Sequence, residues 1–85
     1  MFVVEYSNQA RKFLRKVDKI LAGRLFKKIE GLSSQPFTHD TKSVEGYKEK
    51  LFRVRVGDCR ILYEVDHNSK KIGIVKIDKR SRVYD

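Results

Sequence analysis

Residues 51–65 read LFRVRVGDCRILYEV, two alternating runs of apolar and polar residues on either side of Gly57-Asp58. A two-residue loop that begins with glycine and joins β-patterned runs is a strong signal for a β-hairpin. The sequence therefore predicts an antiparallel hairpin, and the rest of the chain is interpreted around it. The predicted cross-strand partners are Val56 with Cys59, Arg55 with Arg60, Val54 with Ile61, and Arg53 with Leu62.

Successive side chains of a strand point to opposite faces of the sheet, so this hairpin has one apolar face and one basic face. The opposed pair Arg55 and Arg60 costs a few tenths to ~1 kcal/mol, and only Glu64 on the same face is expected to offset the charge. We interpret this basic face as a polyanion-binding surface; the alternative is an ordinary solvated face. The predicted core face carries Phe52, Val54, Val56, Cys59, Ile61 and Tyr63, and the opposite face, called the arginine face below, carries Leu51, Arg53, Arg55, Arg60, Leu62 and Glu64.

The length and charge of the chain limit what it can be. Eighty-five residues make one domain, residues 1–85, with room for one sheet and two or three helices but not for a deep enzyme cleft. Twenty Lys and Arg against 11 Asp and Glu give a formal charge of +9, which favours a nucleic acid or an acidic protein as partner. A lysine-rich, heat-adapted surface is the alternative explanation of the same excess.

Several other classes of protein are disfavoured. The single cysteine, Cys59, cannot form an internal disulfide, which indicates a reducing compartment, and its place on the core face predicts a small buried side chain. His39 and His67 are isolated in predicted loops, without the spacing of a metal site, and no cofactor-binding motif is present. No apolar run is long enough to span a membrane, so we expect a cytoplasmic protein without a metal or small-molecule cofactor.

The remaining segments complete an α+β pattern. Apolar residues at helical spacing predict two amphipathic helices, the first capped by Ser7 or Asn8 and the second by Asp18. The last strand has apolar residues on both faces, which is typical of a central strand. We expect an N-terminal strand, an antiparallel helical hairpin, and a mostly antiparallel four- to five-stranded sheet with the helices on one face. The predicted strands are 2–6, 42–45, the two arms of the hairpin, and 71–77.

The hairpin and the end of the chain together resemble a known group of proteins. The pattern LFRVRVGDCRILYEV, followed after a strand by DKRSRVY, resembles the RelE/ParE superfamily of toxins from prokaryotic toxin–antitoxin pairs, and the resemblance extends over essentially the whole chain. It implies a RelE-like fold and a metal-independent endoribonuclease that enters the ribosomal A site and cuts mRNA with the substrate's own 2′-hydroxyl. It also implies an acidic, RelB-like antitoxin that wraps and blocks the toxin.

The resemblance assigns roles to individual residues. Where RelE-type enzymes carry lysines, this chain has arginines, and a guanidinium is a poor general base because it stays protonated. Catalysis therefore rests on charge stabilisation, or Lys48, Lys50 or Lys79 supplies the base. The implied catalytic residues are Arg60, Arg80 and Tyr84, and the implied RNA- and phosphate-binding residues are Arg53, Arg55, Arg82 and Lys79.

Two other functions are compatible with the same fold. A ParE-like toxin poisons DNA gyrase without cutting RNA, although that branch generally lacks the set formed by Arg60, Arg80 and Tyr84. An inactive paralogue that only binds its antitoxin is the other alternative. Taken alone, the basic end of the chain also fits a frayed terminus.

Overall fold

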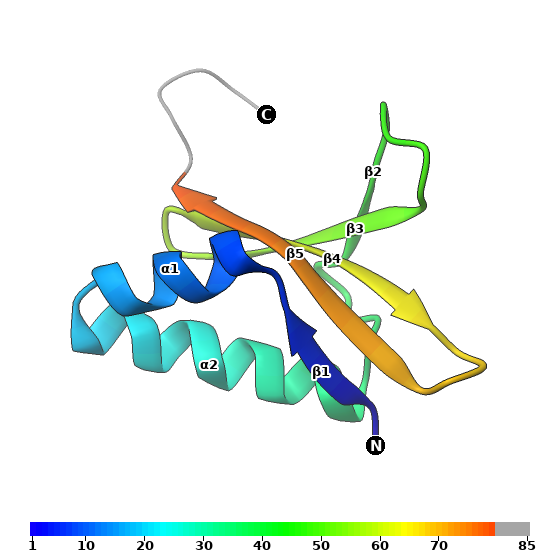
Figure 1. Ribbon diagram of the computed structural model, residues 1–85, viewed down its shortest axis with the longest axis horizontal. Helices are drawn as coiled ribbons and strands as arrows, with labels where there is room; N and C mark the ends of the chain where they lie inside the picture. Colours follow the sequence, from blue (N-terminus) through cyan, green and yellow to red (C-terminus); the bar gives the residue numbers. More distant parts are fainter. Residues whose placement is uncertain (80–85) are drawn as a thin grey trace.

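A computed structural model describes residues 1–79 and shows two helices and a five-stranded sheet within that range (Figure 1). The strand order is β1-β5-β4-β3-β2, with β1 parallel to β5 and every other neighbouring pair antiparallel. The predicted α+β class, the helical hairpin and the mostly antiparallel sheet are confirmed. The elements are β1 (Val3–Tyr6), α1 (Asn8–Lys16), α2 (Lys19–Ser34), β2 (Lys42–Val44), β3 (Leu51–Val56), β4 (Cys59–Asp66) and β5 (Lys71–Lys79).

The hairpin formed by β3 and β4 has the register that the sequence predicts. Val56 pairs with Cys59, and Arg55 pairs with Arg60. Gly57 opens the turn with φ of +56°, in the left-handed region that glycine enters without steric cost. The predicted pairing and the alternation of the two faces are therefore confirmed.

Both helices pack against the same face of the sheet (Figure 1). The hairpin contributes Val54, Ile61 and Tyr63, each with no exposed surface, and α2 contributes Leu25 and Leu32. Burial of this apolar surface is the main source of stability, at roughly 25 cal/mol per Å². The arginine face points away from the helices, and it is only partly open to solvent, because Leu51 and Leu62 on it are 2% and 4% exposed.

β5 carries a bulge that the sequence did not predict. The register changes between Leu62, which pairs with Lys76, and Tyr63, which pairs with Ile74, so Val75 is an extra residue in β5. A bulge of this kind resets the alternation of faces. Ile72, Ile74 and Ile77 therefore all lie buried in the core, whereas Val75 is exposed. β5 lies between β1 and β4, so the expectation of a central strand is confirmed.

The start of α1 is attached to the bulged strand. The Ser7 hydroxyl accepts from the Ala10 N–H, as an N-cap does, and donates to the Val75 carbonyl. One residue after α1 begins, the Gln9 side-chain amide donates to the Ile77 carbonyl and accepts from the Ile77 N–H, at 2.7 and 2.9 Å. Beyond the end of β1, the Gln9 side chain thus makes the hydrogen bonds to β5 that a neighbouring strand would make. These bonds hold the start of α1 against the sheet.

The connection from α2 to β2 is held by one buried side chain of β4. The Tyr63 hydroxyl donates to the Pro36 carbonyl at 2.6 Å and lies 3.1 Å from the Thr41 hydroxyl. This contact sets where β2 begins, and so where the segment after it lies. Neither α1 nor α2 combines the length and apolar character needed to cross a bilayer.

Candidate functional site

The arginine face contains a hollow of about 290 Å³. Its base is formed by neighbouring residues of three strands: Arg53 on β3, Arg60 and Leu62 on β4, and Lys76 and Asp78 on β5. Its wall comes from β2 and the segment that follows, through Ser43, Val44, Glu45 and Tyr47. We call this space the arginine hollow.

The sheet register explains why these cations lie together. Arg53 is paired with Leu62, and Leu62 is paired with Lys76 on its other side. Residues directly opposite each other on one face have Cβ atoms about 4.5–5.5 Å apart. The hollow therefore gathers positive groups from β3, β4 and β5 above an apolar floor, since Leu62 is only 4% exposed.

Arg60 is held by a carboxylate that the sequence analysis missed. Its Nε donates to Asp78 Oδ1 at 3.2 Å and its Nη2 donates to Asp78 Oδ2 at 3.1 Å. Lys76 Nζ lies 3.7 Å from the same Oδ2. The side chains of Arg60 and Asp78 are each about a quarter exposed. This two-point contact orients the guanidinium, because a planar fork bound at two atoms cannot rotate freely.

The expectation that only Glu64 offsets the arginines was wrong. Glu64 pairs with Gly73, toward the other end of the sheet, and it lines a different hollow. Asp78 was missed because the predicted strand ended at Ile77, whereas β5 continues to Lys79. The signal that was available is the alternation of Lys76, Ile77 and Asp78, which extends the strand pattern by two residues.

Tyr47 and Lys76 are site residues that the sequence analysis did not single out. Tyr47 follows Gly46, whose φ is +94°, and its side chain is 51% exposed at the wall of the hollow. An exposed aromatic ring beside cations is typical of surfaces that bind single-stranded nucleic acid, where bases stack on the ring. Lys76 adds a half-exposed ammonium group that shares Asp78 with Arg60.

The structure separates several other predicted residues from the arginine hollow. Arg55 is exposed and pairs with Arg60, but it lines a second hollow and not the arginine hollow. Lys79 pairs with Cys59, on the face that the helices cover. Lys48 and Lys50 are exposed on the connection between β2 and β3, and Lys50 lines the hollow that contains Glu64.

Three predicted residues, Arg80, Arg82 and Tyr84, lie outside the described residues. Their assigned roles stay predictions, and so do those of the basic residues above.

The chemistry of the arginine hollow is that of an anion-binding site. Guanidinium and ammonium groups bind phosphate oxygens, and Glu45 is a carboxylate at its wall that can accept a proton. Within residues 1–79, no group of three or more His, Cys, Asp or Glu side chains is arranged to hold a metal ion. Burial raises the pKa of the Cys59 thiol, which disfavours the reactive thiolate, as expected of a small side chain in the core.

Comparisons with known proteins place the chain in a family. A family model described as the ParE toxin of the type II toxin–antitoxin system parDE matches residues 4–84. No match to a curated protein sequence was found. Among solved structures, the archaeal RelE–RelB complex from Pyrococcus horikoshii OT3 contains a chain that is 29% identical, with a TM-score of 0.83 and coverage of 96% of this chain and 98% of that one.

Two further structures share the fold at lower identity. The isolated E. coli RelE toxin is 18% identical with a TM-score of 0.82, over 98% of this chain and 88% of that one. A chain of the RelBE2 toxin–antitoxin complex from Mycobacterium tuberculosis is 24% identical with a TM-score of 0.79, over 93% of this chain and 98% of that one. Because the family model spans nearly the whole sequence, this chain belongs to the ParE toxin family, within the RelE/ParE superfamily of type II toxin–antitoxin toxins.

Proposed function

We propose that this toxin is a ribosome-dependent, metal-independent endoribonuclease that cuts mRNA and so inhibits translation in the cytoplasm. The observation that supports the proposal is the arginine hollow, in which Arg53, Arg60 and Lys76 converge from three strands. The exposed ring of Tyr47 adds a surface on which a nucleobase can stack. Positive charge beside an exposed ring is the combination that holds a nucleic-acid backbone and its bases.

The proposed reaction is attack of a ribose 2′-oxygen on the adjacent phosphorus, with departure of the 5′-oxygen of the next nucleotide. Arg60, oriented by Asp78, contacts the phosphate and stabilises the negative charge that grows on it, while Arg53 and Lys76 hold the neighbouring backbone. Donors placed against developing charge are each worth roughly 10²–10³ in rate. Glu45 accepts the 2′ proton, because it is a carboxylate at the hollow and arginine is a poor base.

For the residues beyond Lys79, the proposed roles are those that the resemblance to the family implies. Arg80 and Tyr84 act with Arg60 in catalysis, and Arg82 binds phosphate. The departing 5′-oxygen needs a proton, which we assign to Lys76 because its ammonium group lines the hollow.

The proposed partner that controls the toxin is an acidic, RelB-like antitoxin. The P. horikoshii relative was crystallised as a RelE–RelB complex. A chain with a formal charge of +9 attracts an acidic protein strongly at low salt. Such a partner would compete with RNA for the same positive surface.

The test is to express the toxin in cells and in a purified translation system and to map mRNA 5′ ends. We expect cuts in phase with codons on translated mRNA and none on the same RNA without ribosomes. Arg60→Ala should lower cutting by at least about 100-fold, and Glu45→Gln should lower it without weakening RNA binding. Lys12→Gln, an exposed change on α1, is the matched control. Continued translation without codon-phased cuts would refute the proposal.

Gyrase poisoning is the second candidate, because the family model that matches the chain is that of ParE toxins. A supercoiling assay with purified gyrase separates the two functions. Loss of supercoiling together with intact mRNA would establish the ParE-like activity, whereas intact supercoiling with cut mRNA would establish the endoribonuclease.

A further inference from the structure

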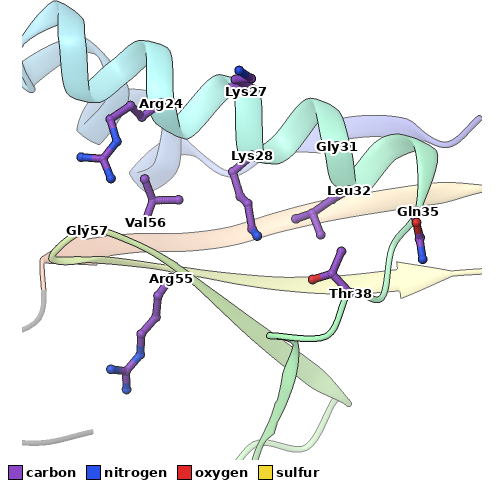
Figure 2. A pocket seen from close by; sticks show the side chains of 10 residues that line it. All are labelled: Arg24, Lys27, Lys28, Gly31, Leu32, Gln35, Thr38, Arg55, Val56 and Gly57. Carbon is purple, nitrogen blue, oxygen red and sulfur yellow. The ribbon is translucent and has the colours of Figure 1, made fainter.

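A second hollow, of about 700 Å³, lies between α2 and the part of β3 that extends beyond β2 (Figure 2). β2 pairs with β3 only at Leu51, Phe52 and Arg53, so the edge of β3 at 54–56 runs on past it. We call this space the α2–β3 groove. It is separate from the arginine hollow, and the function proposed above does not use it.

The groove is lined with positive charge. Arg24, Lys27 and Lys28 come from α2, Arg55 lines the groove at β3 with its side chain directed away from α2 (Figure 2), and none of the lining residues is Asp or Glu. Residues three and four apart on a helix are neighbours on its surface, so Lys27 and Lys28 both lie near Arg24. Asp40, outside the lining, accepts from Lys28 Nζ at 2.9 Å, and the three α2 residues keep a net positive charge.

Gly57 allows Arg24 to reach the groove. A Cβ at residue 57 would lie 3.3 Å from Arg24 Nη1, a tight contact that the glycine avoids. Figure 2 shows the guanidinium of Arg24 extending from α2 toward β3, at the end of the hairpin. The same glycine therefore forms the turn and leaves space for a cation beside it.

Arg55 connects the groove with the arginine face. It lines the groove at the edge of β3, yet its side chain extends away from α2 (Figure 2). Its cross-strand partner is Arg60, which lines the arginine hollow. An RNA backbone that leaves the arginine hollow around the edge of β3 therefore meets Arg55 before it reaches the cations of α2.

The lining favours a nucleic-acid backbone over an acidic peptide. The apolar side chains at the groove, Leu32 and Val56, are 0% and 8% exposed, so they offer no pocket for the apolar anchors that hold peptides in grooves. The accessible groups are Arg, Lys, Gln35 and Thr38, which are the side chains that contact phosphate and sugar. We propose that the α2–β3 groove is a second RNA-backbone site that binds nucleotides flanking those held at the arginine hollow.

This inference rests on RNA being the ligand of the proposed function, and binding alone tests it. The double variant Arg24→Gln/Lys27→Gln removes two exposed cations from the groove, and Lys12→Gln/Lys16→Gln removes two exposed cations from α1 as a matched control. The probes are fluorescein-labelled 2′-O-methyl oligouridylates of about 5 and about 15 nucleotides, which cannot be cut. Anisotropy gives Kd over a range of salt concentrations.

We expect the groove variant to bind the longer probe about 10-fold more weakly, with the salt slope reduced by about 1.4 for two lost phosphate contacts. The control should change both quantities only through the loss of net charge that the two variants share, and with the shorter probe the two variants should behave alike. Equal weakening by groove and control variants would overturn the inference. So would a groove variant that loses binding to oligoglutamate but keeps its affinity for the longer RNA, because the ligand would then be an acidic protein.

The outcome is distinguishable from failure of the proposed function. If the protein binds longer RNA more tightly but cuts no mRNA, the proposed nuclease activity is refuted and the proposed RNA site in the groove stands. If it cuts mRNA in phase with codons but binds short and long RNA equally, only the proposed RNA site is refuted.

Discussion

Arg60 and Asp78 contact each other, but removing one of them should destabilise the fold more than removing the other. The charges lie about 3 Å apart with two hydrogen bonds, and both side chains are about a quarter exposed. A gross attraction of about 5 kcal/mol at an effective dielectric constant of 20 is mostly offset by dehydration and side-chain ordering. A coupling of about 1 kcal/mol remains.

The like-charged neighbours of Arg60 create the asymmetry. Arg60→Ala loses the coupling but also relieves the opposition of Arg55 and Arg60, worth a few tenths to ~1 kcal/mol. Asp78→Ala loses the coupling and removes a negative charge from beside Arg60 and Lys76. We therefore expect Arg60→Ala to cost about 0.5 kcal/mol and Asp78→Ala about 1.5 kcal/mol.

Urea unfolding followed by circular dichroism measures these values, and urea is preferred because guanidinium chloride would screen the charges. The double variant Arg60→Ala/Asp78→Ala completes a cycle that isolates the coupling. The difference between the single variants should shrink at about 1 M NaCl, where the Debye length is ~3 Å. A coupling near zero, or a larger loss for Arg60→Ala than for Asp78→Ala at low salt, would refute the reasoning.

Three further changes test the core and the connection to β2. Tyr63→Phe removes the donor to the Pro36 carbonyl and should cost about 1–2 kcal/mol in urea unfolding; an unchanged midpoint would contradict the role given to this hydroxyl. Ile61→Ala empties a fully buried site and should cost about 3 kcal/mol by the same measurement, so a loss below that of Tyr63→Phe would contradict the assignment of the core face. The Thr38 hydroxyl and then Lys28 lower the pKa of Asp40 from 3.8 to about 2. The stability this gives is therefore present above about pH 4 and lost as the pH falls toward 2. Asp40→Asn should flatten that part of the pH profile and cost about 1 kcal/mol at pH 7, since the carboxylate is one-third exposed.

The sequence by itself determined the class of fold, the register of the central hairpin and the composition of its two faces. Each follows from neighbours along the chain. Gly57-Asp58 fixes which residues pair, and strict alternation then places Val54 and Ile61 on one face and Arg55 and Arg60 on the other. The caps at Ser7 and Asp18 are equally local, because each accepts from an N–H three residues ahead.

Only the tertiary structure decided which of the charged residues form a site. The bulge at Val75 changes the face of every residue after it, and so brings Lys76 and Asp78 to Arg60 but turns Lys79 toward the helices. Tyr47 and Glu45 reach the arginine hollow because β2 is anchored through Tyr63. The α2–β3 groove exists because α2 packs beside an edge that β2 leaves uncovered. These positions depend on contacts between distant segments, which local periodicity does not encode.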